Sequence, residues 1–297
     1  MKALQYPQKS ETSCAVALGF FDGVHPAHRK ILDAAVLKKA EGLTPCVFTF
    51  DSIPAKGSSR LLTTFEERKK LIEKSGIELF VSASFDDLKD MTAEEFVKDV
   101  LIETLNAKAV FCGFNYRFAK GAAADTETLR ILLESLGAKL YVTEEITTEQ
   151  GVLSSTLIRN LLSEGKVKEA SLLLSRNYSL TGEIVHGNAL GRTIDTPTLN
   201  IKVSGEKLLP RFGVYASRVT LGEKTFDAVT NIGMKPTVGS DIPTVEAFLL
   251  NASGDFYGDV ATLELAEFIR PEQKFSSLGE LKTQITKDIE KAKSILK

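Results

Sequence analysis

The sequence contains no tryptophan, and only three histidines and three cysteines occur among its 297 residues. The cysteines, Cys14, Cys46 and Cys112, are odd in number, lie far apart and form no CxxC pair. They therefore predict neither a disulfide framework nor a zinc site. Because histidine is so scarce, its positions are informative: His25 and His28 stand only three residues apart.

The chain also lacks an excess of charge and a long apolar run. Its 37 Lys and Arg residues face 39 Asp and Glu residues, which argues against a protein that neutralises many nucleic-acid phosphates. No stretch approaches the roughly 18 apolar residues of a membrane span. The polar start lacks the apolar core of a signal peptide. We therefore expect a cytoplasmic enzyme that binds neither nucleic acid nor a membrane.

The hydrophobic pattern up to about residue 174 alternates between short apolar runs and segments of helical spacing. This alternation indicates a parallel sheet with helices on both faces. The predicted strands span residues 15–21, 45–50, 78–84, 107–114 and 139–143. The predicted helices span residues 28–39, 64–74, 92–106, 126–136, 154–163 and 167–174. Two of these helices begin with the spacing of a capping box, at Thr64 with Glu67 and at Thr92 with Glu95.

The pattern changes after about residue 177. Short strand-like runs separated by Gly, Pro, Asn and Asp predict an antiparallel barrel. The runs span residues 181–185, 198–203, 213–221, 226–232, 244–250 and 260–268. A final helix over 277–296 opens with Ser277 and Glu280 as a third capping box. The length suits two domains of roughly 100–200 residues each, and we divide the chain into residues 1–177 and 178–297.

The segment from Gly19 to His28 (GFFDGVHPAH) leaves the first predicted strand and enters the first predicted helix. Ligands bind at this end of parallel strands. Glycines let the backbone approach a phosphate, and a helix N-terminus offers N–H groups. Two histidines three apart can face one phosphate chain and stabilise a leaving pyrophosphate. The alternatives are a plain turn with solvated histidines, or a metal site, for which no carboxylate or cysteine stands at a ligand spacing.

A second candidate site begins at Gly182. Glycines at 187 and 191 predict a flexible loop whose N–H groups wrap phosphates. Thr198 and Asn200 stand two apart on a predicted strand, so their side chains share a face. Their oxygens are hard ligands of the kind that suits Mg²⁺ carried with ATP. The alternative is an ordinary hairpin with a glycine-rich turn.

These motifs together resemble the bacterial bifunctional riboflavin kinase/FMN adenylyltransferase (FAD synthetase) family. The first half contributes GFFDGVHPAH, GFNYRFAKG from Gly113 and SSTLIR from Ser154. The second half contributes GEIVHGNALGRTIDTPTLN, PRFGVY, NIGMKPT, the pair Val245-Glu246 and RPEQKF from Arg270. The resemblance covers nearly the whole chain. It implies a Rossmann-like nucleotidyltransferase domain followed by an antiparallel β-barrel riboflavin kinase domain with a C-terminal helix.

The resemblance implies two reactions, phosphorylation of riboflavin to FMN and adenylylation of FMN to FAD, each with ATP. Glu246 is the implied acceptor of the riboflavin 5′-hydroxyl proton, and His25 and His28 are the implied catalytic pair of adenylyl transfer. Thr198 and Asn200 are the implied Mg²⁺ ligands, whereas His186 has no implied catalytic role. The implied ATP-binding residues are Gly19, Phe21, Asp22, Gly23, Ser154, Ser155, Thr156, Arg159, Gly187, Gly191, Arg192, Thr198 and Asn200. The implied flavin-binding residues are Asn115, Arg117, Arg211, Gly213, Tyr215 and Arg270.

The chain departs from the family pattern at a few positions. Alanine replaces a usual glycine at Ala27, Ala119 and Ala124, Ile53 stands where the family often has histidine, and Leu157 and Asp195 also differ. These departures leave open a kinase with a degenerate adenylyltransferase domain and, less favoured, the converse. A third alternative is a non-catalytic flavin-binding regulator. We expect a monomer or a weak homo-oligomer whose partners are riboflavin, FMN and ATP.

Overall fold

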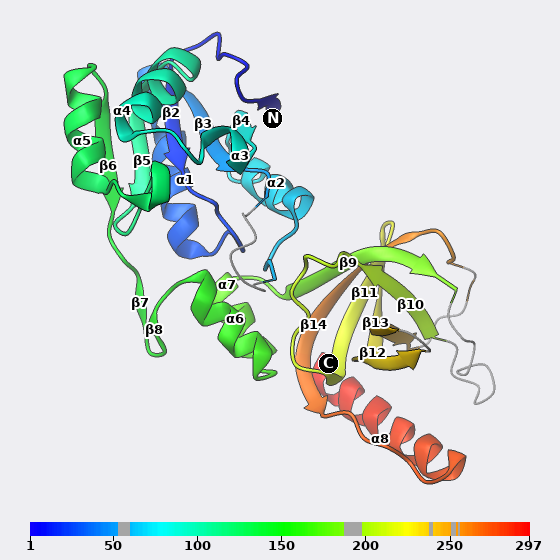
Figure 1. Cartoon of the computed structure of the whole chain (residues 1–297). Coiled ribbons are helices and arrows are strands. Elements are labelled where there is room, and N and C mark those ends of the chain that lie inside the picture. Colours follow the sequence, from blue (N-terminus) through cyan, green and yellow to red (C-terminus); the bar gives the residue numbers. More distant parts are fainter. Residues whose placement is uncertain (53–59, 187–197, 238–239, 251–253, 255) are drawn as a thin grey trace. The chain divides into compact units, whose positions relative to one another are not determined.

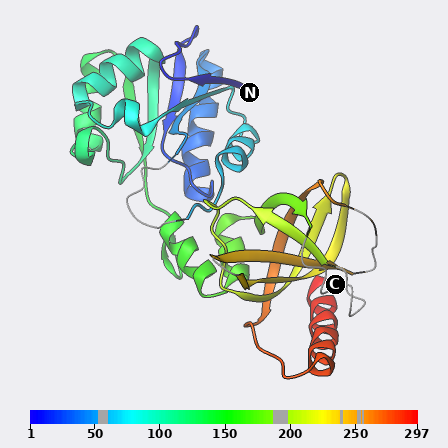
Figure 2. The ribbon, with the colours of Figure 1, turned by 45° about the vertical axis from the view of Figure 1, so that its right-hand side comes forward.

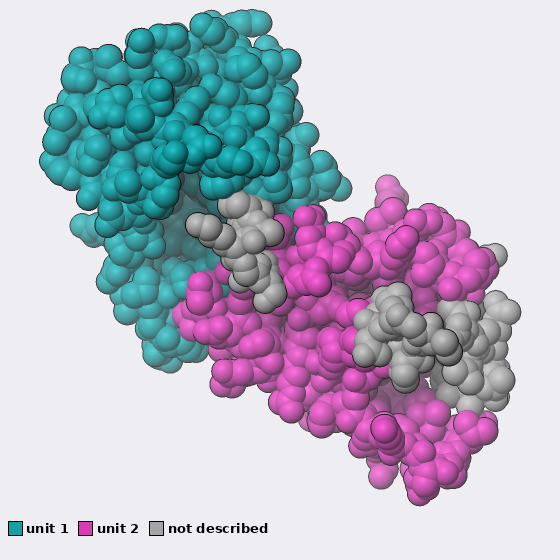
Figure 3. Space-filling view, in the orientation of Figure 1, with its two compact units in different colours: residues 1–59, 63–155 teal, residues 60–62, 156–297 magenta. Residues whose placement is uncertain are grey.

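The computed structural model describes residues 1–52, 60–186, 198–237, 240–250, 254 and 256–297 (Figure 1). The chain divides into two compact units, which Figure 3 colours separately. Unit 1 comprises residues 1–59 and 63–155, and unit 2 comprises residues 60–62 and 156–297. In the described part of the chain, no helix is long and apolar enough to cross a membrane.

Unit 1 is built on a six-stranded sheet in the order β1-β4-β3-β2-β5-β6. Every neighbouring pair in this sheet is parallel, as the alternation of strands and helices predicted. The strands are β1 (Lys2–Gln5), β2 (Cys14–Leu18), β3 (Thr44–Phe50), β4 (Leu79–Ala83), β5 (Ala107–Gly113) and β6 (Lys139–Thr143). The interior strands β2 and β4 are buried along their whole length, as expected where both faces are covered.

Helices cover both faces of this sheet. Alternate residues of β2 point to opposite faces: Val16 and Leu18 pack in one hydrophobic cluster and Ala15 and Ala17 in another. The first cluster is completed by helices α4 (Ala93–Glu95) and α5 (Thr126–Ser135) and by the π-helical segment Phe96–Thr104. The second cluster is completed by α1 (Pro26–Leu37) and α2 (Phe65–Glu73). Unit 1 also contains the short α3 (Phe85–Leu88) and 3₁₀ turns at Lys38–Glu41 and Lys120–Ala122.

Two of the three predicted capping boxes are present in full. Thr64 accepts a hydrogen bond from the Glu67 N–H, and Glu67 accepts one from the Thr64 N–H. Thr92 and Glu95 do the same at α4. At the C-terminal helix only half of the box forms: Ser277 accepts from the Glu280 N–H, while the Glu280 carboxylate accepts from the N–H of Ser276 instead.

Unit 2 opens with two helices and then closes into a barrel. Helices α6 (Ser155–Ser163) and α7 (Val167–Leu174) follow a small hairpin, β7 (Thr147–Thr148) and β8 (Gly151–Val152), which lies in unit 1. The barrel is closed and antiparallel, in the order β10-β13-β12-β11-β14-β9, as predicted. Its strands are β9 (Tyr178–Val185), β10 (Thr198–Val203), β11 (Gly213–Leu221), β12 (Lys224–Thr237), β13 (Ser240–Leu249) and β14 (Val260–Arg270).

The C-terminal helix α8 (Leu278–Leu296) lies along the outside of the barrel in both ribbon views (Figures 1 and 2). It packs against β11, β12 and β14. Ala292 and Leu296 of this helix form a small apolar cluster with Ala216 of β11, against which Val229 also packs. One flank of the barrel is therefore covered by a helix.

Three residues from the first half of the chain, Arg60–Leu62, belong to unit 2. Leu61 donates its N–H to the Glu206 carbonyl and accepts from the Leu208 N–H, both at 2.7 Å. The buried ammonium of Lys207 donates to the Leu62 carbonyl at 2.7 Å and lies 4.8 Å from the centre of the Tyr178 ring. We call Arg60–Leu62 the strap.

Candidate active sites

The first candidate site is the turn between β2 and α1, where the predicted histidine pair comes together. The His25 and His28 rings stack with their centroids 3.7 Å apart and their planes at 18°. His25 is the N-cap residue of α1 and is only 3% exposed. Phe21 meets the His28 ring edge-on at 5.4 Å. The pair therefore lies at a helix N-terminus, where N–H groups favour anions.

The environment of His28 keeps its imidazole neutral at neutral pH. Burial lowers the pKa of His28 well below its ordinary value, and the nearby His25 and Arg68 lower it further. Its Nδ1 atom is buried without a hydrogen-bond partner in the described part of the chain. Most buried polar atoms in proteins have a hydrogen-bond partner, so this nitrogen is an exception.

The backbone of this turn adopts φ angles that residues other than glycine rarely adopt. Phe21 and Val24, neither of them glycine, have φ of +57° and +40°, and Gly23 between them has +81°. A methyl group on Gly19 would meet the Phe21 ring at 3.1 Å, which is tighter than an ordinary van der Waals contact, so the ring would have to move by a few tenths of an ångström. The predicted ATP-binding residues Gly19, Phe21, Asp22 and Gly23 thus lie in one short segment, whose backbone strain is at Phe21 and at the adjoining Val24.

The predicted segment from Ser154 to Arg159 begins one residue before helix α6 and continues into it. The Ser155 hydroxyl donates to the backbone carbonyl of Asp22 at 2.8 Å, which joins this helix start to the histidine turn. The Arg159 Nε donates to the carbonyl of Arg60 at 3.1 Å, within unit 2. Thr156 is exposed. The ATP-binding role of these residues stays a prediction.

The predicted flavin-binding loop after β5 lies at the surface. Asn115 is exposed, and Arg117 pairs with Asp125, which caps α5, at 3.7 Å. Ala119, where the family usually has glycine, has φ of +65° and ψ of 179°. This region of the backbone map is almost exclusive to glycine. The usual glycine at this position therefore has a conformational reason.

The second candidate site is a row of residues across the outer face of the barrel. Asn200 of β10 pairs directly with Glu246 of β13, which pairs with Asn231 of β12. The row continues through Val214 of β11 to Arg270 of β14. Directly paired residues of antiparallel strands point to the same face with Cβ atoms about 5 Å apart. The register therefore places the predicted catalytic Glu246 between two asparagine side chains.

Thr198 joins this face one pair further along. It pairs with Phe248, so Thr198 and Asn200 share the face of Glu246, as their spacing predicted. The alternate residues Val245 and Ala247 are buried on the inner side. The predicted ATP-binding residues Gly187, Gly191 and Arg192 and the family departures Asp195 and Ile53 lie outside the described residues.

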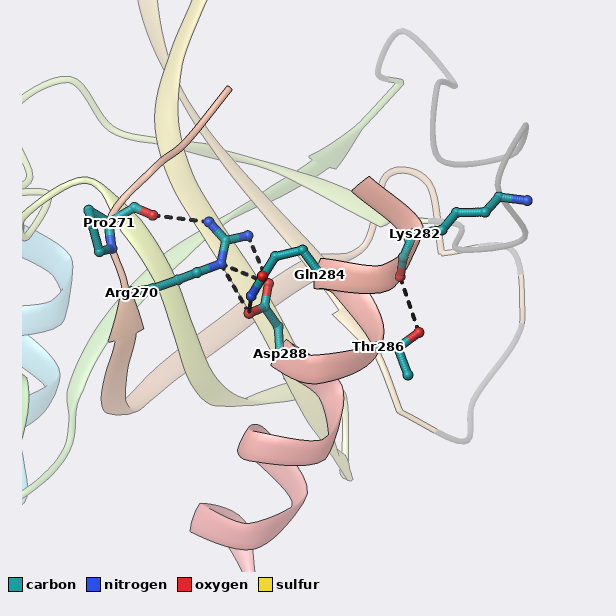
Figure 4. Close-up of polar contacts among 6 residues, drawn as sticks. All are labelled: Arg270, Pro271, Lys282, Gln284, Thr286 and Asp288. Atoms are coloured by element: carbon teal, nitrogen blue, oxygen red, sulfur yellow. Dashed lines mark hydrogen bonds and ion pairs between the residues drawn. The ribbon is translucent and has the colours of Figure 1, made fainter. Parts of the chain in front are cut away.

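Arg270, predicted to bind flavin, is held by helix α8 (Figure 4). Its Nε and terminal nitrogen donate to both carboxylate oxygens of Asp288 at 2.8–3.1 Å. Gln284 donates to the same carboxylate at 2.8 Å, and Arg270 also donates to the carbonyl of Pro271 at 3.0 Å. The Asp288 side chain is 4% exposed and that of Arg270 is 17% exposed. Bidentate pairs of this geometry fix both partners.

The other predicted flavin-binding residues of the barrel differ in exposure: Gly213 and Tyr215 are buried, whereas Arg211 is exposed. Tyr215 is fully buried and donates its hydroxyl to the Arg211 carbonyl, and burial raises the pKa of Tyr215 above its ordinary value. A methyl group on Gly213 would stand 2.4 Å from the Arg270 carbonyl, so this position requires glycine. The Arg211 guanidinium lies 5.3 Å from the centre of the Phe268 ring. Their flavin-binding role stays a prediction.

Sequence reasoning missed three residues that the structure places beside these sites. Asn231 was quoted in the NIGMKPT motif without a role, because its pairing with Glu246 depends on the register of two strands. Thr63 hydrogen-bonds to Asp22, and the guanidinium of Arg68, a fully buried residue, lies 4.0 Å from the centre of the Phe20 ring. No local pattern connects either of these residues with the histidine turn. Among the described residues, no group of three or more His, Cys, Asp or Glu side chains is placed to hold a metal ion.

Comparisons with known proteins match the two halves of the chain to two different families. The FAD synthetase family model matches residues 7–157, and the riboflavin kinase family model matches residues 174–296. A bifunctional riboflavin kinase/FMN adenylyltransferase of Escherichia coli K12 is 34% identical over 95% of this chain and 92% of its own length. The one of Bacillus subtilis is 30% identical over 96% and 93%. A crystal structure named as a macrolide-efflux protein of Streptococcus pneumoniae aligns with a TM-score of 0.88 at 27% identity, over 98% of both chains.

Proposed function

The chain belongs to the family of bifunctional riboflavin kinases/FMN adenylyltransferases, and from this premise we propose which residues carry its two reactions. Residues 178–297 phosphorylate riboflavin to FMN, and residues 1–177 adenylylate FMN to FAD. The observation that carries this assignment is the separation of the candidate residues: the stacked histidines lie in unit 1, and the row around Glu246 lies in unit 2.

Phosphorylation takes place on the outer face of the barrel. Glu246 accepts the proton of the riboflavin 5′-hydroxyl, whose oxygen attacks the γ-phosphorus of ATP, and ADP leaves. Mg²⁺ enters with ATP as part of the substrate. The oxygens of Thr198 and Asn200, on the face of Glu246, are ligands of the type that Mg²⁺ prefers. Asn231, on the other side of Glu246, is placed to orient its carboxylate.

Adenylyl transfer takes place at the histidine turn. A phosphate oxygen of FMN attacks the α-phosphorus of ATP, the bond to the bridging oxygen breaks and pyrophosphate leaves. His25 and His28 donate hydrogen bonds to phosphate oxygens as charge develops on them. A neutral His28 still carries one N–H, so its lowered pKa is compatible with this role.

The proposal also covers the binding partners, the cellular location and the oligomeric state of the enzyme. Riboflavin, FMN and ATP are the small-molecule partners, and the near-balance of 37 basic and 39 acidic residues favours no role in nucleic-acid binding. The enzyme acts in the cytoplasm as a monomer or a weak homo-oligomer.

The test is to incubate the purified full chain with riboflavin, ATP and Mg²⁺ and to resolve FMN and FAD by chromatography. Glu246→Gln should lower FMN formation by about 10²–10⁴-fold and spare conversion of supplied FMN to FAD. His28→Ala should lower FAD formation by about 10²–10³-fold and spare FMN formation. Glu183→Gln, on the exposed face of β9, is the matched control for the first change.

His186→Ala, which removes a histidine that stacks on Tyr257 in unit 2, is the control for adenylyl transfer. Accumulation of FMN without FAD in the unmodified chain would favour a kinase with a degenerate first domain. Absence of turnover with either flavin would favour a non-catalytic regulator. Loss of both reactions from one substitution in a folded protein would contradict the two-site assignment.

A further inference from the structure

The turn that carries the histidine pair needs support from outside its own sequence. Val24 is β-branched and has φ of +40°, and Phe21 has φ of +57°. In a residue with positive φ the Cβ atom clashes with the backbone, and for a bulky or β-branched residue such a conformation is an outlier. Conformations of this kind persist only where surrounding contacts hold them. The contacts that hold this turn therefore decide where His25 lies.

Thr63, which is 3% exposed, supplies three of these contacts. Its N–H and its hydroxyl donate to the Asp22 Oδ1 at 2.9 and 3.1 Å. The same hydroxyl oxygen accepts the N–H of Gly23 at 3.0 Å. Asp22 is likewise 3% exposed. One side chain thus binds two consecutive residues of the strained turn, in a site where unmade hydrogen bonds are costly.

The residues that follow Thr63 fix the position of Thr63. Thr64 is the N-cap of α2 and forms a complete capping box with Glu67, so the chain at residue 63 leads directly into a capped helix. One turn into this helix, Arg68 donates to the carbonyl of Phe50 at 2.6 Å and lies over the Phe20 ring. The start of α2 therefore supports the chain on both sides of Asp22.

We propose that Thr63 is a positioning residue for adenylyl transfer, whose hydroxyl holds the Asp22–Gly23 peptide so that His25 and the first N–H groups of α1 face the substrate phosphates. The inference rests on the proposed function of unit 1. A hydroxyl group is required because it donates to Asp22 and accepts from Gly23 at the same time. Valine has nearly the same shape and does neither. A small displacement of catalytic groups is enough to lower a rate by up to about 10²-fold.

The experiment compares three variants of the full chain. Thr63→Val should lower kcat for FAD formation by about 10–10²-fold with a smaller change in KM, while riboflavin phosphorylation in the same protein stays within about 2-fold. Thr63→Ser keeps the hydroxyl and should restore kcat to within about 3-fold. Thr104→Val is the matched control, because Thr104 is equally buried in unit 1 and its hydroxyl donates to the Asp99 carbonyl at 2.7 Å, away from the turn.

A second readout separates this inference from the function on which it rests. Amide exchange of Gly23 should become at least about 10-fold faster in Thr63→Val and stay unchanged in Thr104→Val. If the unmodified chain makes no FAD, the proposed function fails, and the Gly23 exchange rate alone decides whether Thr63 holds the turn. If the unmodified chain makes FAD and Thr63→Val does so with the same kcat, or loses no more than Thr104→Val, the positioning role is wrong.

Discussion

The two units of this protein place their chemistry in opposite ways. In unit 1 the candidate catalytic residues, His25 and His28, stand three residues apart at the start of α1, directly after a strained turn that Thr63 and Ser155 hold through Asp22. In unit 2 Asn200, Glu246 and Asn231 come from three strands, and the register of the barrel aligns them.

The two sites therefore depend on different interactions to keep their catalytic residues in place. A site aligned by strand register depends on the whole barrel, because a one-residue slip would turn Glu246 to the other face. A site on a strained turn depends on a few hydrogen bonds, because the backbone has better conformations available to it. Substitutions far from either site should therefore affect unit 2 through stability and unit 1 through geometry.

The largest effect on stability is expected when the Arg270–Asp288 pair, which joins α8 to the barrel, is broken. Asp288→Ala leaves a mostly buried guanidinium without its carboxylate, which should lower the free energy of unfolding of unit 2 by about 3–5 kcal/mol. Urea unfolding followed by peptide-resolved hydrogen exchange would measure this loss. Conversion of FMN to FAD should persist under conditions where unit 1 stays folded.

The matched control is Asp227→Ala in the Arg218–Asp227 pair of the same barrel. Those side chains are 40% and 48% exposed, so the loss should be about 0–1 kcal/mol. Equal losses in the two variants would mean that the Arg270–Asp288 pair contributes no more to stability than an exposed ion pair.

The next effect is a pH dependence confined to unit 1. Burial holds the pKa of His28 well below 6.5 in the folded state, so below about that pH the unfolded chain binds a proton that the folded chain does not. The stability contribution of the neutral imidazole is therefore complete above pH 6.5 and is lost as the pH falls. In His28→Gln the slope of unfolding free energy against pH should decrease by at most about 1.4 kcal/mol per pH unit.

Unfolding of each unit between pH 7.5 and 5 would test this expectation. His28→Gln should leave the pH profile of unit 2 as it is in the unmodified chain. Identical profiles of unit 1 with and without His28 would show that this imidazole titrates as it does in the unfolded chain.

The smallest expected effect is stabilising. Ala119 has φ of +65° and ψ of 179°, which glycine adopts without a steric penalty, so Ala119→Gly should raise the stability of unit 1 by about 1 kcal/mol. Ala123→Gly, at φ of −72°, should instead lower it by about 0.5–1 kcal/mol, because there glycine only adds freedom to the unfolded chain. Thermal unfolding of both variants gives the sign. If Ala119→Gly lowered the stability of unit 1, the inference that Ala119 is strained would be wrong.

Hydrophobic pattern predicted most of the fold because most elements bury one face or both. The runs at β10 and β11 match the predicted strands at both ends. Strand β1 was missed, since it has only four residues and three of them are exposed, which leaves no apolar signal. Strand β12 extends beyond both of its predicted ends, and β13 begins four residues before its predicted start, where cross-strand pairing continues without an apolar pattern.

The features of the sites that depend on local spacing were predicted, and those that depend on tertiary contacts were not. The proximity of His25 and His28, and the shared face of Thr198 and Asn200, follow from local spacing. The bond between Thr63 and Asp22 joins residues 41 apart, and that between Arg270 and Asp288 depends on how α8 packs. Contacts of this kind are set by tertiary structure, so no local pattern contains them.

The strap has a practical consequence for anyone who wishes to express the kinase half alone. A gene fragment that begins after residue 155 would encode the barrel and its helices without Arg60–Leu62. The N–H of Leu208 and the carbonyl of Glu206 would then lose their backbone partners, and the buried ammonium of Lys207 would lose the Leu62 carbonyl. The boundary between the two activities is therefore not a single cut in the chain, and a recombinant kinase fragment needs those three residues restored or Lys207 replaced.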